Sequence, residues 1–207
     1  MRLAVFGATG RVGRRIVEYA ARDGHTTRAL VRDAGRLPAG LGGQVVAGDV
    51  TDPMAVRATL EGAEAVLSAL GGAGLANPGT TLSEGMKTIV AEMKRAGIAR
   101  VLAVAGSGVL DGADGRLRSE APTFPAIFAA INREHLGTWQ ALKSSQLDWT
   151  LVCCPDLLDG ELTKRFRVTA DVLPENGTSI SVEDTAFFLL QQMRLTPFVR
   201  RRVGIAY

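Results

Sequence analysis

The stretch FGATGRVG, residues 6–13, constrains the fold of this chain more than any other part of its sequence. A short apolar run precedes it and the helix-like segment RRIVEYAARDG follows it, so strand, glycine-rich turn and helix occur in the order of a dinucleotide site. In such a site Gly7 allows the tight turn, Gly10 lets the backbone approach a pyrophosphate, and Gly13 lets the helix pack on the strand. The pyrophosphate then lies at the positive N-terminus of the helix.

The spacing of the three glycines is G-x-x-G-x-x-G, whereas the commonest dehydrogenases have G-x-G-x-x-G. Three glycines alone are also compatible with a turn that binds no ligand. The motif follows the first strand of a strand–helix–strand unit, and this context favours dinucleotide binding.

The end of the second strand indicates which dinucleotide is bound. An NAD site usually carries an acidic residue there, about 20 residues after the glycines, to bind the ribose 2′-hydroxyl. This chain has Arg32 at that position and Arg36 one turn later, and we expect Asp33 to point away. Arginine can bind a 2′-phosphate through charge-assisted hydrogen bonds, so NADP(H) is favoured over NAD(H). The alternative is that both arginines are merely solvated.

Apolar runs and helical patterns alternate along the chain to residue 155, which predicts a doubly wound, mostly parallel α/β sheet of the Rossmann type. We expect a single NAD(P)-binding domain, residues 1–207, with a small C-terminal embellishment of short strands and a helix starting near Val182. The expected strands are residues 3–6, 26–32, 43–50, 63–70, 99–107 and 147–155, and the expected helices are 11–24, 53–60, 80–97 and 124–145. Loops 76–79 and 111–125 would lie at the carboxyl ends of strands, where open α/β sheets bind ligands.

Composition excludes several classes of partner. Aromatic residues make up 5% of the chain and its net charge is +3 with scattered arginines, so we expect no binding to nucleic acid. No apolar run approaches the ~18 residues of a membrane span. The first residues do not show a charged segment followed by an apolar one, so we expect no signal peptide. The cysteines, Cys153 and Cys154, are neighbours within an apolar run and predict no disulfide framework, so we expect a reduced, cytoplasmic protein. We expect no metal, and a monomer is favoured.

The segments GATGRVG, LVRDAGRLP, GDV, SEGMKTIVAEMKRAGIARV and QLDWTLVCCPDLLDG together resemble the atypical short-chain dehydrogenase/reductases with an NAD(P)H-binding fold. Within that family they are most similar to the branch of NADPH-dependent flavin reductases and biliverdin reductases. The resemblance extends from Leu3 to the helix around Met193.

The resemblance implies a role for residues at the end of each strand. Phosphate contacts would come from Thr9, Gly10, Arg11 and Val12, and 2′-phosphate contacts from Arg32 and Arg36. Around the adenosine half it implies Asp49, Val50, Leu70 and Gly71. Around the nicotinamide it implies Ala105, Gly106, Ser107, Cys154 and Pro155.

Ordinary short-chain dehydrogenases use a Tyr-x-x-x-Lys pair, and this chain has none, since neither Tyr19 nor Tyr207 precedes a lysine by four residues. Counting back from SSQLDWT, the lysine position falls on His135 and the tyrosine position on Ile131. Without that acid/base pair, carbonyl–alcohol chemistry is not expected. A flavin or a conjugated tetrapyrrole can accept a hydride without an acid from the enzyme at the same atom. Most of the rate enhancement would then come from holding the hydride donor and the acceptor in contact.

Three residues are the candidates for a catalytic role. Ser107 is a hydrogen-bond donor near the reacting centre, unless its hydroxyl only satisfies a strand-end backbone group. His135 matches a histidine of the resembled branch, although a single histidine on a helix is more often structural. Asp156 stands where the biliverdin reductases of that branch have histidine, and its negative charge disfavours biliverdin relative to a flavin.

Two classes of function follow. The first is an NADPH-dependent reductase of a small flavin-like acceptor, with quinones or tetrapyrroles as further acceptors. The second is a non-catalytic NADP(H)-binding protein that acts as a redox sensor or regulator.

Overall fold

A computed structural model describes residues 1–37 and 43–207 of the chain. Eight strands form one sheet in the order β3-β2-β1-β4-β5-β6-β10-β8, and every neighbouring pair is parallel except β10 and β8. The strands of this sheet are β1 Arg2–Phe6, β2 Thr26–Val31, β3 Gln44–Ala47, β4 Ala65–Ser68, β5 Arg100–Gly106, β6 Asp148–Cys154, β8 Arg167–Ala170 and β10 Arg201–Ala206. A separate parallel pair consists of β7 Asp156–Leu158 and β9 Ser179–Ser181.

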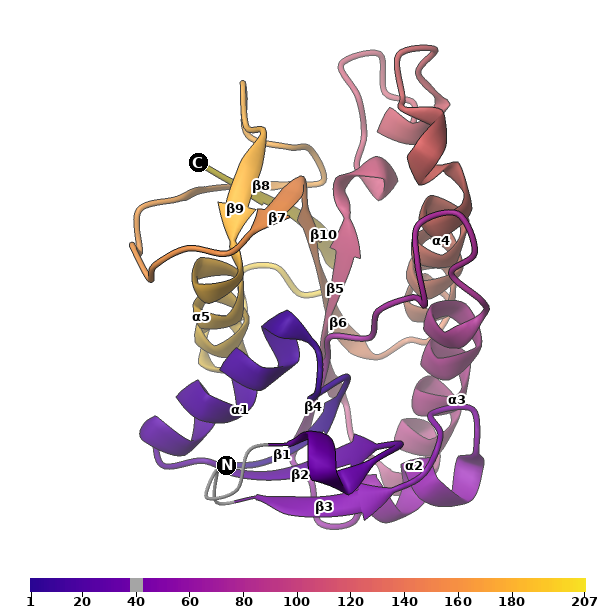
Figure 1. Cartoon of the computed structure of the whole chain (residues 1–207), viewed down its shortest axis with the longest axis vertical. Helices are drawn as coiled ribbons and strands as arrows, with labels where there is room; N and C mark the ends of the chain where they lie inside the picture. The colour runs from indigo at the N-terminus through magenta and orange to yellow at the C-terminus, as the bar shows by residue number, and fades with distance from the viewer. Residues whose placement is uncertain (38–42) are drawn as a thin grey trace.

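Helices cover both faces of the sheet, as Figure 1 shows. On one face lie α1 Arg11–Arg22 and α5 Val182–Arg194, and on the other lie α2 Pro53–Leu60, α3 Thr81–Ala96 and α4 Ala129–Lys143. This is the doubly wound, mostly parallel α/β fold that the sequence predicts. Within the described ranges, no helix combines the length and the apolar character needed to cross a membrane.

Each strand supplies both hydrophobic cores because its side chains alternate between the two faces. Leu3 and Val5 of β1 belong to the core under α1 and α5, whereas Ala4 and Phe6 belong to the core under α2, α3 and α4. All four are at most 1% exposed. Burial on both faces explains why the strand sequences are apolar without polar alternation.

The structure differs from the sequence prediction in two elements. The helix expected over residues 124–145 begins at Ala129, because Ala126–Phe128 form a separate 3₁₀ turn before it. Strand β10 was not predicted, and it lies within the main sheet between β6 and β8. The sheet therefore continues through the C-terminal part of the chain.

The order of the strands places a ligand crevice beside β1. The chain runs outward from β1 to β2 and β3, and then returns to β4 on the other side of β1. At such a reversal the loops after neighbouring strands diverge, and a crevice opens at their carboxyl ends.

Candidate functional site

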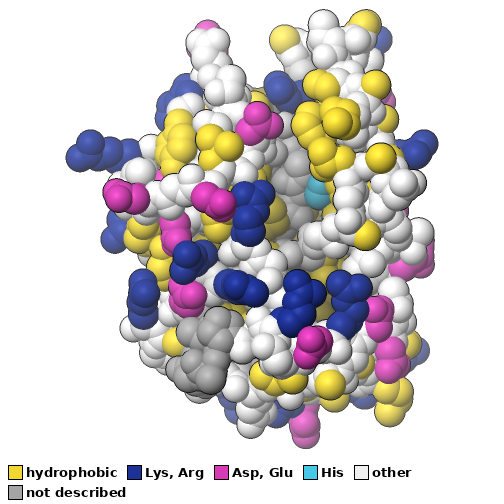
Figure 2. Space-filling view, in the orientation of Figure 1, with side chains coloured by type: hydrophobic (Ala, Val, Ile, Leu, Met, Phe, Trp, Pro, Cys, Tyr) yellow, Lys and Arg dark blue, Asp and Glu magenta, His cyan; other side chains and the backbone are white. Residues whose placement is uncertain are grey.

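A cleft of about 940 Å³ lies over the carboxyl ends of the central strands. Figure 2 shows this hollow, with a histidine side chain (cyan) on its wall and hydrophobic side chains (yellow) on both rims. The sequence-predicted site residues that line it are Gly7, Thr9, Gly10, Arg11, Val12, Arg32, Arg36, Asp49, Val50, Leu70, Gly71, Ala105, Gly106, Ser107, His135, Cys154, Pro155 and Asp156. Residues from the ends of β1, β2, β4, β5 and β6 and from α4 thus meet in one cleft.

The three glycines of the first turn have different environments. Gly7 has φ +81°, and a Cβ there would lie 2.3 Å from the carbonyl oxygen of Ala69. Gly13 does not line the cleft, and its Cβ would lie 2.1 Å from the carbonyl oxygen of Gly7. A Cβ on Gly10 would come no closer than 3.3 Å to that same oxygen. Gly7 and Gly13 are therefore required by the packing of the protein itself, whereas Gly10 leaves space at the cleft.

The N-terminus of α1 is the helix end that faces this space, and no side chain caps it. Three of the other four helices have a side-chain oxygen on an N–H group of their first turn, whereas α4, like α1, has none among the described residues. Asp52 accepts from Met54 N in α2, Ser181 accepts from Asp184 N in α5, and the Glu134 carboxylate accepts from Ser83 N in α3. The uncapped N–H groups of α1, with no acidic residue in the first turn, suit an anion such as a pyrophosphate.

Two exposed arginines, Arg32 and Arg36, line the same end of the cleft after β2. The carboxylate of Asp33 accepts the backbone N–H of Gly35 at 3.0 Å, and Asp33 does not line the cleft. Arg14, which sequence reasoning missed, donates to the carbonyl oxygen of Arg36 at 3.3 Å. Since the Asp33 carboxylate is occupied in its own turn, the two arginines keep their charge on this side of the cleft, with Asp49 on the opposite side.

The opposite side of this end is formed by Asp49 and Val50. The hydroxyl of Thr51 donates to Asp49 Oδ1 at 2.6 Å and its backbone N–H at 2.9 Å, and both hold the pKa of Asp49 below its usual value. A Cβ on Gly85 would lie 2.7 Å from Val50 Cγ1 and 3.2 Å from Leu70 Cδ1. Gly85, another residue that sequence reasoning missed, therefore lets α3 approach the cleft wall.

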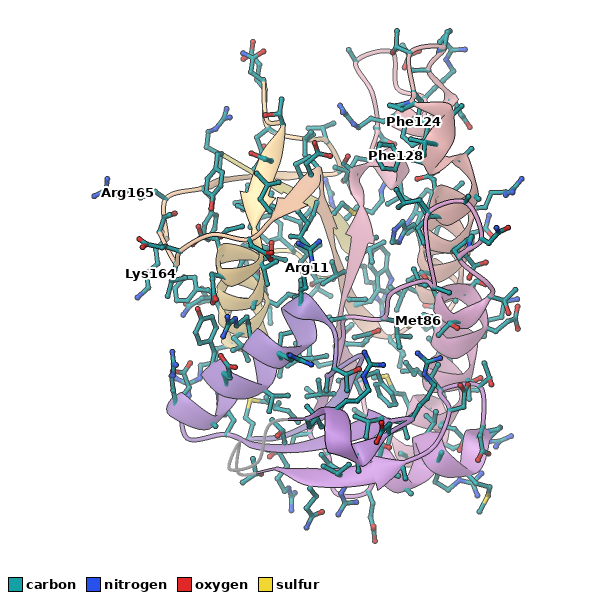
Figure 3. The ribbon with its side chains drawn as sticks, viewed as in Figure 1. Arg11, Met86, Phe124, Phe128, Lys164 and Arg165 are labelled. Carbon is teal, nitrogen blue, oxygen red and sulfur yellow. The ribbon has the colours of Figure 1, made fainter. Side chains whose placement is uncertain are left out.

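Arg11 lines the cleft and also spans it to the segment after β6. Its Nη1 donates to the carbonyl oxygen of Leu157 at 3.1 Å and lies 3.2 Å from Asp159 Oδ1. Figure 3 shows Arg11 at the upper end of α1, below β7. The glycine turn and the β7 segment are thus joined directly at the surface.

At the end of β5 the chain turns into the 3₁₀ segment Ser107–Val109. Within the described chain the Ser107 hydroxyl makes no hydrogen bond, and Ser107 lines the cleft. A Cβ on Gly108 would lie 2.2 Å from Asn132 Oδ1, so this turn packs directly on α4. Asn132 is 5% exposed and lines the cleft, one position after Ile131. Sequence reasoning missed Asn132, although its spacing from His135 places both on one helix face.

His135 lies against the end of β5, because a Cβ on Gly106 would meet its Cδ2 at 3.2 Å. Burial lowers the pKa of His135 to about 4, and its Nδ1 is buried without a partner among the described residues. The ring is therefore neutral at pH 7 and cannot deliver a proton as an imidazolium ion.

The wall after β6 combines an inert thiol with a free carboxylate. Cys154 is 4% exposed, and burial raises the pKa of its thiol to about 12, so it contributes a wall and no nucleophile. Pro155 follows it, and Asp156 is exposed at the cleft.

The outer part of the cleft has an apolar side that the sequence did not reveal. Phe124 and Phe128 form an edge-to-face pair with ring centroids 6.4 Å apart, and Pro125 and Ile131 lie on the same lining. Figure 3 shows both phenylalanines above α4. Arg118 lines this end of the cleft as well. Neither tyrosine nor lysine occurs among the lining residues, and the described chain contains no cluster of three His, Cys, Asp or Glu able to hold a metal ion.

Known proteins with this architecture include reductases. A family model described as NAD(P)H-binding matches residues 7–195. A candidate exported protein from Burkholderia pseudomallei is 32% identical, with 100% of both chains covered and a TM-score of 0.85. ChuY, an anaerobilin reductase from Escherichia coli O157:H7, is 25% identical over 100% of this chain and 97% of its own, with a TM-score of 0.81. A candidate NADH-flavin reductase from Streptococcus pneumoniae TIGR4 is 25% identical over 100% and 99%, with a TM-score of 0.83.

Proposed function

The chain belongs to the NAD(P)H-binding family, and we propose that it is an NADPH-dependent reductase that transfers hydride to a flavin-like acceptor. The observation that carries this proposal is the composition of the cleft. Its inner part has the uncapped helix and glycine turn of a dinucleotide site, and its outer part has an aromatic wall without tyrosine or lysine. Anaerobilin and NADH-flavin reductases among the similar structures agree with an acceptor of this kind.

The preference for NADPH is supported by Arg32 and Arg36, which lie where the ribose 2′-phosphate would be bound. We assign phosphate contacts to Thr9, Gly10, Arg11 and Val12. We assign contacts with the adenosine half to Asp49, Val50, Leu70 and Gly71. We assign the nicotinamide surroundings to Ala105, Gly106, Ser107, Cys154 and Pro155.

When bound, NADPH supplies a hydride, and the acceptor takes up this hydride together with one proton from solvent. The protein's contribution is to hold the two rings in contact and to keep water from the nicotinamide side. We assign to Ser107, which lines the cleft, a hydrogen bond to the acceptor, and to neutral His135, which packs against Gly106, the support of the end of β5. Asp156 is not required as an acid, because hydride acceptance at a flavin nitrogen needs no proton from a carboxylate.

A screen of NADPH oxidation tests the proposal. Purified protein is mixed with NADPH and, in turn, FMN, riboflavin, a quinone, a tetrapyrrole, a simple ketone and a simple aldehyde. We expect turnover with the flavins and little or none with the ketone and aldehyde, since no phenol is present to protonate an alkoxide. Activity on simple ketones would overturn the mechanism. Tight binding of NADPH without its oxidation by any of these acceptors would favour the function of a redox sensor instead.

We further propose that residues 1–207 act as one domain, as a monomer in the cytoplasm. The outer faces of α3 and α4 are polar, with exposed Lys87, Lys94, Arg133 and Lys143, which does not favour pairing of these helices with a second copy. Both cysteines are buried and free, as in a reducing compartment.

A further inference from the structure

The outer part of the cleft has an uneven distribution of charge. Of all lining residues, only Asp49 and Asp156 are acidic, and Asp49 lies at the end assigned to adenine. Asp156 follows β6 on one side of the outer cleft, while Arg118 lies in the loop after β5 together with the aromatic wall. The two are not within ion-pair distance of one another among the described contacts.

The loop that carries Arg118 has three acids, and each is already engaged. Asp111 accepts from Arg202 at 2.7 Å, Asp114 pairs with Arg116 at 2.7 Å, and Glu120 accepts the backbone N–H of Leu117 at 3.2 Å. In the described part of the chain the guanidinium of Arg118 has neither an ion pair nor a side-chain hydrogen bond. An exposed cation at a cleft, with every neighbouring acid occupied, can accept an outside anion.

The backbone of Arg118 is nevertheless fixed. Its N–H donates to the carbonyl oxygen of Leu110 at 2.8 Å, and it begins the 3₁₀ turn Arg118–Glu120. Leu110 is itself fully buried. The guanidinium therefore projects from an anchored point beside the aromatic wall.

We propose that Arg118 binds an oxyanion on the side chain of the acceptor, so that the site selects planar conjugated acceptors that carry a carboxylate or phosphate. The proposal rests on the proposed function. The rings of the acceptor would lie against Phe124 and Phe128, and its anionic group would lie on the Arg118 side, away from the carboxylate of Asp156. Arg118 and Asp156 together then determine which way round the acceptor enters.

FMN and riboflavin test this directly, because they share one ring system and differ by a phosphate. Affinities are measured by flavin fluorescence in the presence of saturating NADP⁺, which occupies Arg32 and Arg36 and removes them as competing phosphate sites. We expect FMN to bind wild-type protein roughly tenfold more tightly than riboflavin, as for a partly exposed charge-assisted pair. Arg118→Met should remove this difference by weakening FMN alone, and Arg118→Lys should restore part of it.

Arg116→Met is the matched control, since Arg116 is an exposed cation two positions away that does not line the cleft. It should leave the FMN-to-riboflavin ratio within about twofold of wild type. Equal binding of both flavins by wild type, an unchanged ratio in Arg118→Met, or an equal loss in Arg116→Met would each overturn the proposal. Because these are binding measurements, they decide on Arg118 even if no flavin is turned over, and absent turnover would contradict only the proposed function.

A tetrapyrrole and its dimethyl ester distinguish carboxylate from phosphate as the bound group. If the site accepts carboxylates, wild type should bind biliverdin more tightly than biliverdin dimethyl ester, and Arg118→Met should abolish that difference. If wild type prefers FMN to riboflavin but binds biliverdin and its dimethyl ester equally, the recognised oxyanion is phosphate. Loss of both preferences at high salt is expected for a pair at the cleft rim.

Discussion

Arg32 is the residue on which the proposed preference for NADPH depends most. It lies at the end of β2, and the carboxylate of Asp33 is occupied by Gly35 N, so no acid competes for the guanidinium from this turn. We expect Arg32→Ala to weaken NADPH by roughly ten- to a hundredfold, or about 1.5–3 kcal/mol, while leaving NADH nearly unchanged. Calorimetric titration of both proteins with both cofactors measures this. Equal affinity of wild type for NADPH and NADH would contradict the assignment.

The buried side chain of His135 should make the stability of the folded protein depend on pH. Its pKa is about 4 in the folded protein and about 6.5 when unfolded, so the unfolded chain binds more protons between these values. The stability of the folded protein is therefore expected to fall as pH decreases through this window, by about 2 kcal/mol between pH 7.5 and pH 4.5 from this residue alone. Urea unfolding of wild type and His135→Gln at both pH values isolates the effect. An identical acid-induced loss in the two proteins would show that His135 does not contribute.

In the turn between β1 and α1, one glycine is required for cofactor binding and another for folding. A Cβ on Gly10 would make one tight contact, 3.3 Å from the carbonyl oxygen of Gly7, which a small shift of the turn can relieve. Gly10→Val should therefore still fold and should lose NADPH binding, because the valine occupies the pyrophosphate position. Gly13→Val should instead destabilise the fold by several kcal/mol, since its Cβ would overlap the Gly7 carbonyl. Circular dichroism, urea unfolding and NADPH titration of both variants measure the two effects. A folded Gly10→Val protein with normal NADPH affinity would place the phosphates elsewhere.

The elements that sequence reasoning identified are those with a local signal. The glycine turn, the Pro53 start of α2 and the Gly97 end of α3, where φ is +69°, are each encoded within a few residues. Strand β10 has no such signal, because it contains Gly204 and only a short apolar run. Its position depends on pairing with β6, about fifty residues earlier in the chain.

The site divides in the same way. The lining residues proposed for the dinucleotide could be named from the sequence because strand ends and a glycine motif mark them. On the acceptor side, sequence reasoning named Ser107 and Asp156, which follow strands. It missed Arg118, Phe124 and Asn132, because the loop after β5 and helix α4 bring these residues together only through tertiary packing. Phe128 moreover ends the separate 3₁₀ turn Ala126–Phe128, and Phe124 lies just before that turn, where the sequence predicts a continuous helix.

At the scale of the whole molecule, one buried cation ties the acceptor half to the sheet. Arg202 of β10 is 7% exposed, donates to the Val109 carbonyl and to Asp111, and lies 4.3 Å from the Trp139 ring centroid. Its Nε also lies 3.6 Å from Asp171, after β8. A single side chain thus holds together β10, the loop after β5, the end of β8 and helix α4.

Although Arg202 lies near one edge of the sheet, its removal should therefore lower the stability of the whole protein. Arg202→Met would leave Asp111 partly buried with its charge unpaired, and we expect a loss of about 3–5 kcal/mol in the free energy of unfolding. Arg201→Met, the neighbouring exposed residue whose only described ion pair is with Asp171, should cost at most about 1 kcal/mol. Urea midpoints of the two variants measure the difference. Because the loop after β5 carries Ser107 and Arg118, Arg202→Met protein that remains folded should also bind FMN more weakly while its NADPH affinity changes little. Equal stability of the two variants would mean that the sheet holds this loop without Arg202.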